Sequence, residues 1–480
     1  MKLKHLFLSL AAFAALSASA AAVPENAPEP AAAPAESLAP KYVFYFIGDG
    51  MGWAHVINAD LYKTGVLKEP SMSMLSMPVV GLARTHSANS RVTDSAAAGT
   101  ALSTGHKTRN GMLGMDADTT AVVSIAKVLF DRGWGVGLVT TSAIDDATPA
   151  AFYAHVDNRG QKETIGRQLA ESGYQFAAGA GPEAMYKNVG LPAYFKEKGY
   201  TVSYGKSGLD VVADKVLVLS PDTVKTWECD YAIDSVPDAL HLPDMTAAAI
   251  RHLSRVTPDH FFLMVEGGII DHAAHSNDGG TAVREVLAFD QSIQLAMQFY
   301  ASHPDETLIV VTADHETGGF SVGDNTSGYA VYPEKVAAEK ISKSEFENYV
   351  KSLARNRRVY RWNDMKEYLT ENLGFWKTVD ISAGETAELK KMFEEMMAGR
   401  SSAADQETLY ASFRGFTAEV FRLLNDKAGF GWTSTKHTGS PVPVLAMGPG
   451  AYRFSALNDN TELPRKILGI VLGPGTACLR

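Results

Sequence analysis

Short apolar runs, separated by longer amphipathic stretches, constrain the fold of this chain more than any other feature. The apolar runs cover Tyr42–Ile47, Gly135–Thr140, Phe261–Val265, Leu308–Thr312 and Val442–Ala446. Their length predicts buried strands, and helical periodicity marks three of the intervening stretches, Ala121–Phe130, Met245–Leu253 and Val283–Tyr300. Buried strands that alternate with helices favour a parallel sheet with both faces covered. The sequence therefore predicts an α/β fold, a three-layer sandwich around a large, mainly parallel central sheet.

The composition is that of a globular protein with a large core. The chain has 480 residues, of which 46% are hydrophobic and 20% are charged. A formal net charge of -10 argues against a uniformly basic nucleic-acid-binding surface, so no nucleic-acid partner is expected. The two cysteines, Cys229 and Cys478, either form one disulfide or stay free, and they do not make a disulfide scaffold.

The N-terminus predicts export from the cytoplasm. Two lysines precede an apolar run over Leu6–Leu16, which is too short to span a bilayer, and Ser17–Ala20 supplies the small residues of a cleavage site. We therefore expect a signal peptide over residues 1–20 and a periplasmic or secreted mature protein. An Ala/Pro-rich linker over residues 21–40 follows. No later stretch has the run of about 18 uncharged apolar residues that a transmembrane segment needs.

The segment Asp94–Ala101 places a serine beside a carboxylate at the predicted start of an alanine-rich helix. A serine hydroxyl is a weak nucleophile until its proton is removed or its oxyanion is stabilised. A helix N-terminus supplies partial positive charge and free N–H groups, and a metal ion would supply more. Ser95 is therefore a candidate nucleophile, although the same motif also suits a capped helix without a catalytic role.

Candidate ligands follow the carboxyl ends of the predicted strands, where open α/β sheets form their binding sites. Asp49 lies in the glycine-rich turn after the first strand, and the loop after the second contains Asp146 and Thr148. Glu266 directly follows the third strand. Taken alone, each of these residues also suits an ordinary polar loop.

Histidines and aspartates form further groups downstream. Asp271 and His275 are four residues apart, so one helix face can present both to one metal ion. Asp314 and His315 follow the fourth strand, and His437 precedes the fifth. Five such groups at predicted strand ends are far less probable by coincidence than any one of them. The sequence therefore predicts a metal-dependent active site.

These motifs, in this order, resemble the alkaline phosphatase family. The matching segments are Gly48–Gly52, Asp94–Ala97, Asp146–Ala151, Val265–Gly267, Asp271–His275, Thr312–His315 and His437–Gly439. The resemblance implies an α/β sandwich with a central mixed sheet, secretion, and hydrolysis of phosphate monoesters through a phosphoserine on Ser95.

The resemblance also implies two zinc ions and one magnesium ion. The ligands implied for one zinc are Asp271, His275 and His437. Those implied for the other zinc are Asp49, Asp314, His315 and Ser95. Those implied for magnesium are Asp49, Thr148 and Glu266. Histidine and carboxylate ligands suit zinc, and oxygen ligands suit magnesium.

Three further residues are implied to contact the substrate. Arg159 lies eleven positions after Thr148, as an arginine does in this family, and its planar guanidinium matches two phosphate oxygens. Asp146 and His272 form a mixed pair, because some bacterial relatives that share the aspartate carry lysine at the position of His272. This departure leaves the pH optimum and the magnesium affinity open.

Residues 41–480 are expected to form one catalytic domain with an insertion over 321–430. The insertion has no catalytic motif, and it predicts charged helices over Lys343–Arg355 and Thr386–Met397. It resembles the crown region of some family members. It would shape substrate access, contribute to a homodimer contact, or form a solvated cap.

Two alternative functions remain open at this point. A phosphodiesterase of the same superfamily often has a threonine nucleophile and lacks the magnesium ligands, whereas Ser95, Thr148 and Glu266 are all present here. A non-catalytic secreted metal-binding protein would not need Ser95 or Arg159. A sulfatase is disfavoured because the chain has no Cys-x-Pro-x-Arg motif.

We predict that the mature protein begins near Ala21 and is recovered from the periplasm or from outside the cell. The reason is that the positive start, the short apolar run and the small residues after it are the features that a signal peptidase recognises. N-terminal sequencing of the active protein tests this expectation. An active protein that still begins at Met1 would contradict it.

Overall fold

The computed structural model describes residues 39–181, 190–221, 227–234, 236–355, 360–399 and 406–473. The predicted signal peptide and nearly all of the predicted linker lie outside these residues, as does Cys478. Cys229 is a buried free thiol whose sulfur lies 3.6 Å from the Ser220 hydroxyl. Burial raises the pKa of the Cys229 thiol to about 12, so it is not activated as a nucleophile.

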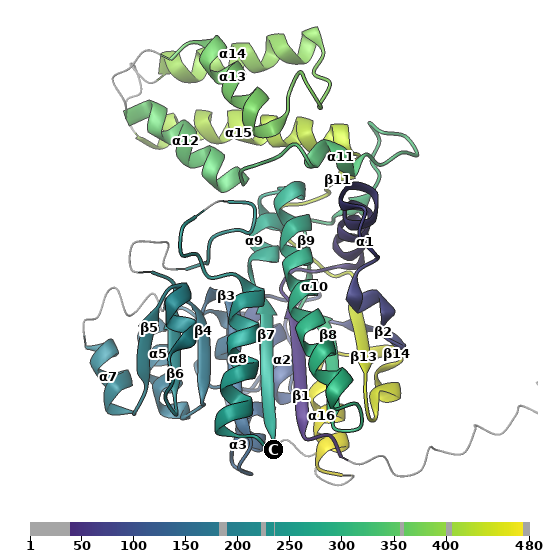
Figure 1. Cartoon of the computed structure of the whole chain (residues 1–480). Coiled ribbons are helices and arrows are strands. Elements are labelled where there is room, and N and C mark those ends of the chain that lie inside the picture. The colour runs from purple at the N-terminus through teal and green to yellow at the C-terminus, as the bar shows by residue number, and fades with distance from the viewer. Residues whose placement is uncertain are drawn as a thin grey trace, which may run out of the picture. The chain divides into compact units, whose positions relative to one another are not determined.

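A ten-stranded sheet is the centre of the fold (Figure 1). In spatial order its strands are β14 (Ala456–Asp459), β2 (Val79–Arg84), β13 (Val442–Met447), β8 (Thr307–Ala313), β1 (Tyr42–Gly48), β7 (Phe261–Gly267), β3 (Gly135–Ala143), β4 (Phe176–Ala180), β6 (Val216–Leu219) and β5 (Thr201–Tyr204). Among these strands, β13 runs antiparallel to its neighbours β2 and β8, and every other pair is parallel. The prediction of a mainly parallel sheet is confirmed.

The five predicted strands are confirmed as β1, β3, β7, β8 and β13. The other five strands were not predicted, and they lie toward the two edges of the sheet. β2 and β5 leave part of their side chains exposed, so they lack a continuous apolar run. β4 consists mostly of alanine and glycine, which have little intrinsic preference for strands.

Helices cover both faces of the sheet (Figure 1). On one face α8 (Leu242–Val256) and α10 (Gly279–Ser302) pack together, with α1 (Trp53–Tyr62) against α10. On the other face lie α2 (Ser95–Thr104), α3 (Ile125–Phe130), α4 (Ala147–Ala150) and α16 (Glu462–Val471). The remaining elements of this region are α5 (Lys162–Ser172), α7 (Leu191–Glu197), α9 (Ile269–His275) and the single turns η1 (Lys63–Leu67), η2 (Ser73–Ser76), η3 (Lys206–Asp210) and η4 (Ala451–Phe454). The described residues thus form the predicted three-layer α/β sandwich.

The helices predicted within α8 and α10 are confirmed, and both extend further in the structure. The predicted helix over Ala121–Phe130 is wrong at its start, because α3 begins at Ile125. Ser124 caps α3 by accepting a hydrogen bond from the Lys127 amide at 3.2 Å. The amide of Val122 instead bonds a loop carbonyl, so the residues before the cap are not helical.

Complete burial explains why the central strands read as continuous apolar runs. All seven residues of β1 are buried, because helices cover the sheet on both sides. The ring of Phe46 in β1 meets the ring of Phe289 in α10 edge to face, with centroids 5.8 Å apart. This packing joins the central strand to the helical layer.

A separate group of helices, which we name the cap helices, lies beyond the carboxyl ends of the central strands (Figure 1). They are α11 (Pro333–Val336), α12 (Lys343–Arg355), α13 (Trp362–Leu373), α14 (Ala383–Gly399) and α15 (Gln406–Ala428). The helix predicted over Lys343–Arg355 is confirmed as α12, and the one over Thr386–Met397 lies within α14. α12 and α14 both pack against α15. The boundaries of the insertion, 321–430, stay a prediction.

Four two-residue strands complete the structure between the sheet and the cap helices. β9 (Glu316–Thr317) pairs with β12 (His437–Thr438), and β10 (Ser321–Val322) pairs with β11 (Phe430–Gly431). The first pair holds the segment after β8 against the segment before β13. Among the described residues, no helix has both the length and the apolar character that crossing a membrane requires.

Candidate active site

Three neighbouring strands bring candidate ligands to one edge of the sheet. Ile47 of β1 pairs with Glu266 of β7, and Gly48 pairs with Ala313 of β8. Asp49 and Asp314 are the residues that follow this second pair. The parallel register therefore places side by side three carboxylates that are far apart in the sequence.

Ser95 is the first residue of α2 and is 4% exposed. Asp94 caps this helix, because its carboxylate accepts a hydrogen bond from the Ala97 amide at 3.0 Å. The Ser95 hydroxyl lies 3.3 Å from Nε2 of His315. The helix N-terminus thus presents the hydroxyl to the candidate metal ligands.

Asp49, Asp314 and His315 form one buried group, with ligand atoms that lie within 4.8 Å of one another. Nε2 of His315 is 3.4 Å from Oδ1 of Asp49 and 3.2 Å from Oδ2 of Asp314. The second oxygen of Asp314 accepts hydrogen bonds from the amides of Gly50 and His315. The two oxygens that face the His315 ring have no hydrogen-bond donor among the described residues.

Asp271, His275 and His437 form a second group. The Asp271 carboxylate lies 3.2 Å from Nε2 of His275 and 3.7 Å from Nε2 of His437. Nδ1 of His275 faces the Thr435 carbonyl at 2.7 Å, and Nδ1 of His437 faces the Thr93 carbonyl at 2.9 Å. Donation from Nδ1 to these carbonyls leaves each Nε2 as a lone-pair acceptor, and the two Nε2 atoms are 3.0 Å apart. Two lone pairs this close repel each other unless a cation or a proton lies between them.

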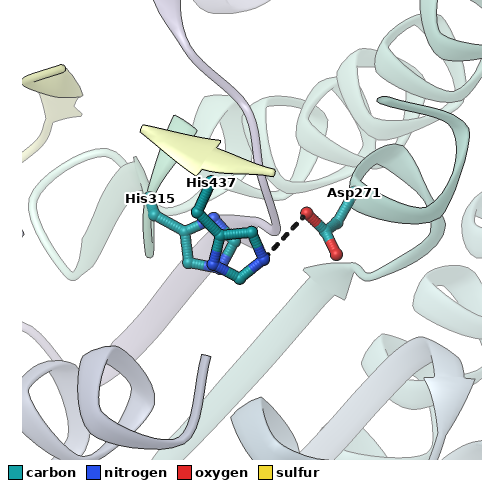
Figure 2. Close-up of side chains that lie close together, drawn as sticks. All are labelled: Asp271, His315 and His437. Atoms are coloured by element: carbon teal, nitrogen blue, oxygen red, sulfur yellow. Dashed lines mark ion pairs between the residues drawn. The ribbon is translucent and has the colours of Figure 1, made fainter. Parts of the chain in front are cut away.

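His315 connects the two groups. Its ring stacks on the ring of His437, with centroids 3.5 Å apart. Figure 2 shows both rings facing the Asp271 carboxylate, and the ligand atoms of these three residues lie within 4.8 Å of one another. The structure therefore brings all the residues predicted for the two zinc sites into one continuous cluster.

The residues predicted for magnesium include two buried oxygens with no hydrogen-bond partner. The Thr140 hydroxyl donates to Oε2 of Glu266 at 2.5 Å. Oε1 of Glu266 and the hydroxyl oxygen of Thr148 make no hydrogen bond of normal geometry among the described residues, although the Thr148 hydroxyl is near enough to Glu266 to act on its pKa. Burial raises the pKa of Glu266 to about 7. Unpartnered buried oxygens are rare in native proteins, and these fit the preference of a hard cation for oxygen ligands.

Arg159 lies between two carboxylates. Its Nη2 is 3.1 Å from Oδ1 of Asp146, and its Nη1 is 3.6 Å from Oδ2 of Asp94. Asp146 also contacts the Lys162 ammonium at 3.2 Å. Burial opposes ionisation of Asp146, but Arg159 and Lys162 outweigh it and hold the pKa of Asp146 below its usual value. The Arg159 side chain is 32% exposed, so the guanidinium is held in place and still open to a ligand.

Comparisons with known proteins place the chain in one family. A sequence model of the family described as Alkaline phosphatase matches residues 40–178 and 220–471. The chain belongs to the alkaline phosphatase family. It is accordingly a hydrolase of phosphate monoesters, and the resemblance inferred from the sequence is confirmed.

Several individual alkaline phosphatases match most of the chain. Alkaline phosphatase 4 of Bacillus subtilis is 31% identical over 443 residues, which cover 90% of this chain and 88% of the relative. The cold-active alkaline phosphatase from the psychrophile Shewanella sp. has 29% identity and a TM-score of 0.75, over 89% of this chain and 99% of that one. The Thermus thermophilus alkaline phosphatase has 26% identity and a TM-score of 0.72, over 91% and 92% of the two chains. The α/β architecture is thus that of solved alkaline phosphatases.

Polar residues that the sequence analysis missed contact the predicted ones. The Thr317 hydroxyl donates to Asp271 at 2.5 Å, and the spacing of two residues after His315 could have suggested it. No motif surrounds Glu228, whose carboxylate lies 2.7 Å from Nδ1 of His272. Burial lowers the pKa of His272, but the contact with Glu228 outweighs burial and raises it to about 9. Thus His272 has its own acidic partner in Glu228.

The buried carboxylates of this alkaline phosphatase site require compensating charge. Burial and neighbouring carboxylates raise the pKa of Asp49 and of Asp314 well above the usual range. Bound cations would remove this penalty and keep the carboxylates ionised. The unpartnered oxygens of Asp49, Asp314 and Glu266, together with the facing Nε2 atoms of His275 and His437, fit metal ions as their common partner.

We predict that removing metal ions with a chelator lowers activity and melting temperature together. Without cations the buried carboxylates repel one another, and an ion held at about a hundred times its Kd contributes about 2.7 kcal/mol of stability. Calorimetry, activity and elemental analysis of the same sample measure the effect, and zinc plus magnesium should restore both properties. Full activity and an unchanged melting temperature in metal-free protein would contradict the prediction.

Proposed function

We propose that the chain hydrolyses phosphate monoesters through a phosphoserine on Ser95, with two zinc ions and one magnesium ion. The observation that supports this most strongly is the position of the Ser95 hydroxyl. It lies at the N-terminus of α2 and 3.3 Å from Nε2 of His315, inside a cluster of buried aspartates and histidines. A hydroxyl in that position can be deprotonated and can attack the phosphorus atom of a bound ester.

The proposed ions divide the cluster into three sets. One zinc would bind Asp271, His275 and His437; the second would bind Asp49, Asp314, His315 and Ser95; and magnesium would bind Asp49, Thr148 and Glu266. When bound, such ions lower the pKa of the serine hydroxyl and of water, and they offset the charge of the phosphoryl group. A mutant of the TAB5 alkaline phosphatase, 26% identical to this chain with a TM-score of 0.61, has been solved with magnesium bound.

The chain's own residues carry out the remaining steps. Ser95 attacks in line, so the bond from phosphorus to the ester oxygen breaks, a phosphoserine forms and an alcohol leaves. Water then hydrolyses the phosphoserine and restores the hydroxyl. Arg159 would bind two phosphate oxygens with its planar fork, while Asp94 and Asp146 keep the guanidinium oriented. Asp146 and His272 would contact the phosphate or its water shell.

We also propose that the protein is exported and acts in the periplasm or outside the cell. The support is the N-terminal pattern alone, with its positive start, its short apolar run and its small residues. Sequencing of the mature N-terminus, described above, tests this proposal.

A homodimer through one edge of the sheet is a further proposal. Val80 and Leu82 of β2 and Leu457 of β14 are 56%, 37% and 49% exposed. Leu82 pairs with Leu457, so the three side chains lie on the same face of the sheet. An exposed apolar group of this kind is typical of an interaction surface.

We predict that the wild-type protein sediments as a dimer and that Leu457→Asp shifts it toward the monomer, because the charge would be buried in the interface. Analytical ultracentrifugation measures both. Val212→Asp is the control, since Val212 is 76% exposed and lies in the connection between β5 and β6, at the other edge of the sheet. A monomeric wild type, or a variant that remains fully dimeric, would contradict this surface.

We predict that Ser95→Ala loses nearly all activity but keeps its fold and its metal content, because the change removes one oxygen and no core volume. Wild-type enzyme quenched in acid with labelled phosphate should carry the label on Ser95. Mass spectrometry of the digested protein locates the label. Finding it on another residue would refute the assigned nucleophile.

The phosphodiesterase alternative is tested by substrate preference. A monoester offers three non-bridging oxygens and two negative charges, whereas a diester offers two oxygens and one charge. Losing a charge-assisted bidentate contact costs a few kcal/mol. Each 1.4 kcal/mol corresponds to about a tenfold change in kcat/KM. We predict that kcat/KM for p-nitrophenyl phosphate exceeds that for bis-p-nitrophenyl phosphate by at least about a hundredfold.

Arg159→Ser should lower the ratio of kcat/KM for p-nitrophenyl phosphate to that for bis-p-nitrophenyl phosphate, because it weakens monoester turnover more than diester turnover. Arg167→Ser is the matched control, because Arg167 is a half-buried arginine of α5 that pairs with Glu163. Comparable efficiencies of the wild type on the two esters would favour the phosphodiesterase.

A further inference from the structure

A cleft of about 800 Å³ lies between the ligand cluster and the cap helices. One wall contains His275 and Thr435, and the Thr435 carbonyl is the group that orients the His275 ring. The opposite wall comes from α12, α14 and α15. This volume is in the range of pockets that enclose a drug-sized molecule, and it is far more than a phosphoryl group needs.

The helix α15 presents its exposed face to this cleft. Arg414, Ala418 and Arg422 are spaced by four residues, so they lie along one side of the helix, and all three are exposed lining residues. Phe416 and Val420, on the other side of α15, are buried. The buried side of α15 therefore packs into the protein core, and the side with Arg414, Ala418 and Arg422 is left to face the cleft.

Apolar and flat surfaces contribute to the lining beside His275. Met392 of α14, Phe421 of α15 and Trp432 all line the cleft. The Trp432 ring is fixed, because it stacks on Phe320 with centroids 4.0 Å apart. Gly318 makes room for it, since a Cβ at that position would lie 2.5 Å from the indole. An immobile aromatic wall of this kind suits contact with a ring system.

The charges of the lining nearly balance one another. Its cations and carboxylates are Lys343, Arg414, Arg422, Asp324, Glu347, Glu419 and Asp426. Arg422 binds Glu419 and Asp426, and the Lys343 ammonium donates to the Ser276 carbonyl at 2.7 Å. Four carboxylates against three cations oppose the entry of a leaving group with several negative charges. An uncharged group with apolar faces and hydrogen-bonding edges meets no such opposition.

We propose that this cleft binds the leaving group of the phosphate monoester, and that it favours a large uncharged ring system of the nucleoside type over a small alcohol. The inference rests on the proposed function, because it needs the ester at Ser95 with its leaving oxygen toward Asp271, His275 and His437. Since His275 belongs both to that cluster and to the cleft wall, a leaving group that departs on this side enters the cleft directly.

The test compares two esters that release the same kind of primary alcohol. Adenosine 5′-monophosphate carries a base, and ribose 5-phosphate does not. We expect the metal-loaded wild type to have a kcat/KM at least about tenfold higher for the nucleotide. Ala418→Trp fills the cleft from α15, and it should remove most of that preference while leaving ribose 5-phosphate turnover within about twofold.

Ala387→Trp is the matched control, because Ala387 is an exposed alanine of α14 that is not part of the cleft lining. It should keep the wild-type preference. Equal efficiencies of the wild type on the two esters would overturn the proposal, as would an Ala418→Trp variant that loses activity on both to the same extent. Failure of the metal-loaded wild type to hydrolyse p-nitrophenyl phosphate would instead refute the proposed function itself.

Discussion

Repulsion among buried carboxylates is the constraint on which the rest of the active site depends. Asp49, Glu266, Asp271 and Asp314 are each at most 5% exposed. Carboxylates in that environment either take up protons or are matched by cations, because an unpaired buried charge is very unfavourable. Matching by cations is consistent with the neighbouring histidines His275 and His437, whose Nδ1 atoms face backbone carbonyls and whose Nε2 atoms point into the cluster. The folded chain thus leaves these buried carboxylates short of positive charge, and bound metal ions would supply it.

A stiff support is required to hold like charges this close. The candidate ligands Asp49, Glu266 and Asp314 lie at the carboxyl ends of β1, β7 and β8, whose residues are buried on both faces and paired in continuous parallel register. Ser95 comes from a different layer, at the capped start of α2. Packing of α2 on α4 brings the proposed nucleophile Ser95 and the proposed magnesium ligand Thr148 toward the same edge of the sheet.

The cap helices line one side of the cleft next to the candidate active site. They pack against one another through apolar side chains, for example between α14 and α15. What they direct toward the sheet is the polar and small-residue face of α15. Under the proposals made above, chemistry at phosphorus and recognition of the leaving group belong to different parts of the chain. Changes in the cap helices could alter substrate preference without altering the carboxylates and histidines.

The sequence by itself determined the α/β class, the five central strands and the residue types of the candidate metal cluster. Those features are local, because full burial produces a continuous apolar run and the ligands directly follow such runs. Residues whose partners lie far along the chain could not be found this way. Lys162 beside Asp146, Glu228 beside His272 and the cleft under α15 all depend on which segments the folded sheet brings together.

His437 shows most clearly which information came from the sequence and which came only from the tertiary structure. The sequence placed it before a strand, whereas the carboxylates follow theirs, and only the tertiary structure shows that both positions are at one edge. The reason is that β13 runs antiparallel to β8, so its first residue lies near the last residues of its neighbours. Strand direction within a sheet is set by long-range pairing, which leaves no local mark on the sequence. The candidate site residues could therefore be predicted from the sequence, but where they come together depends on the strand directions of the folded sheet.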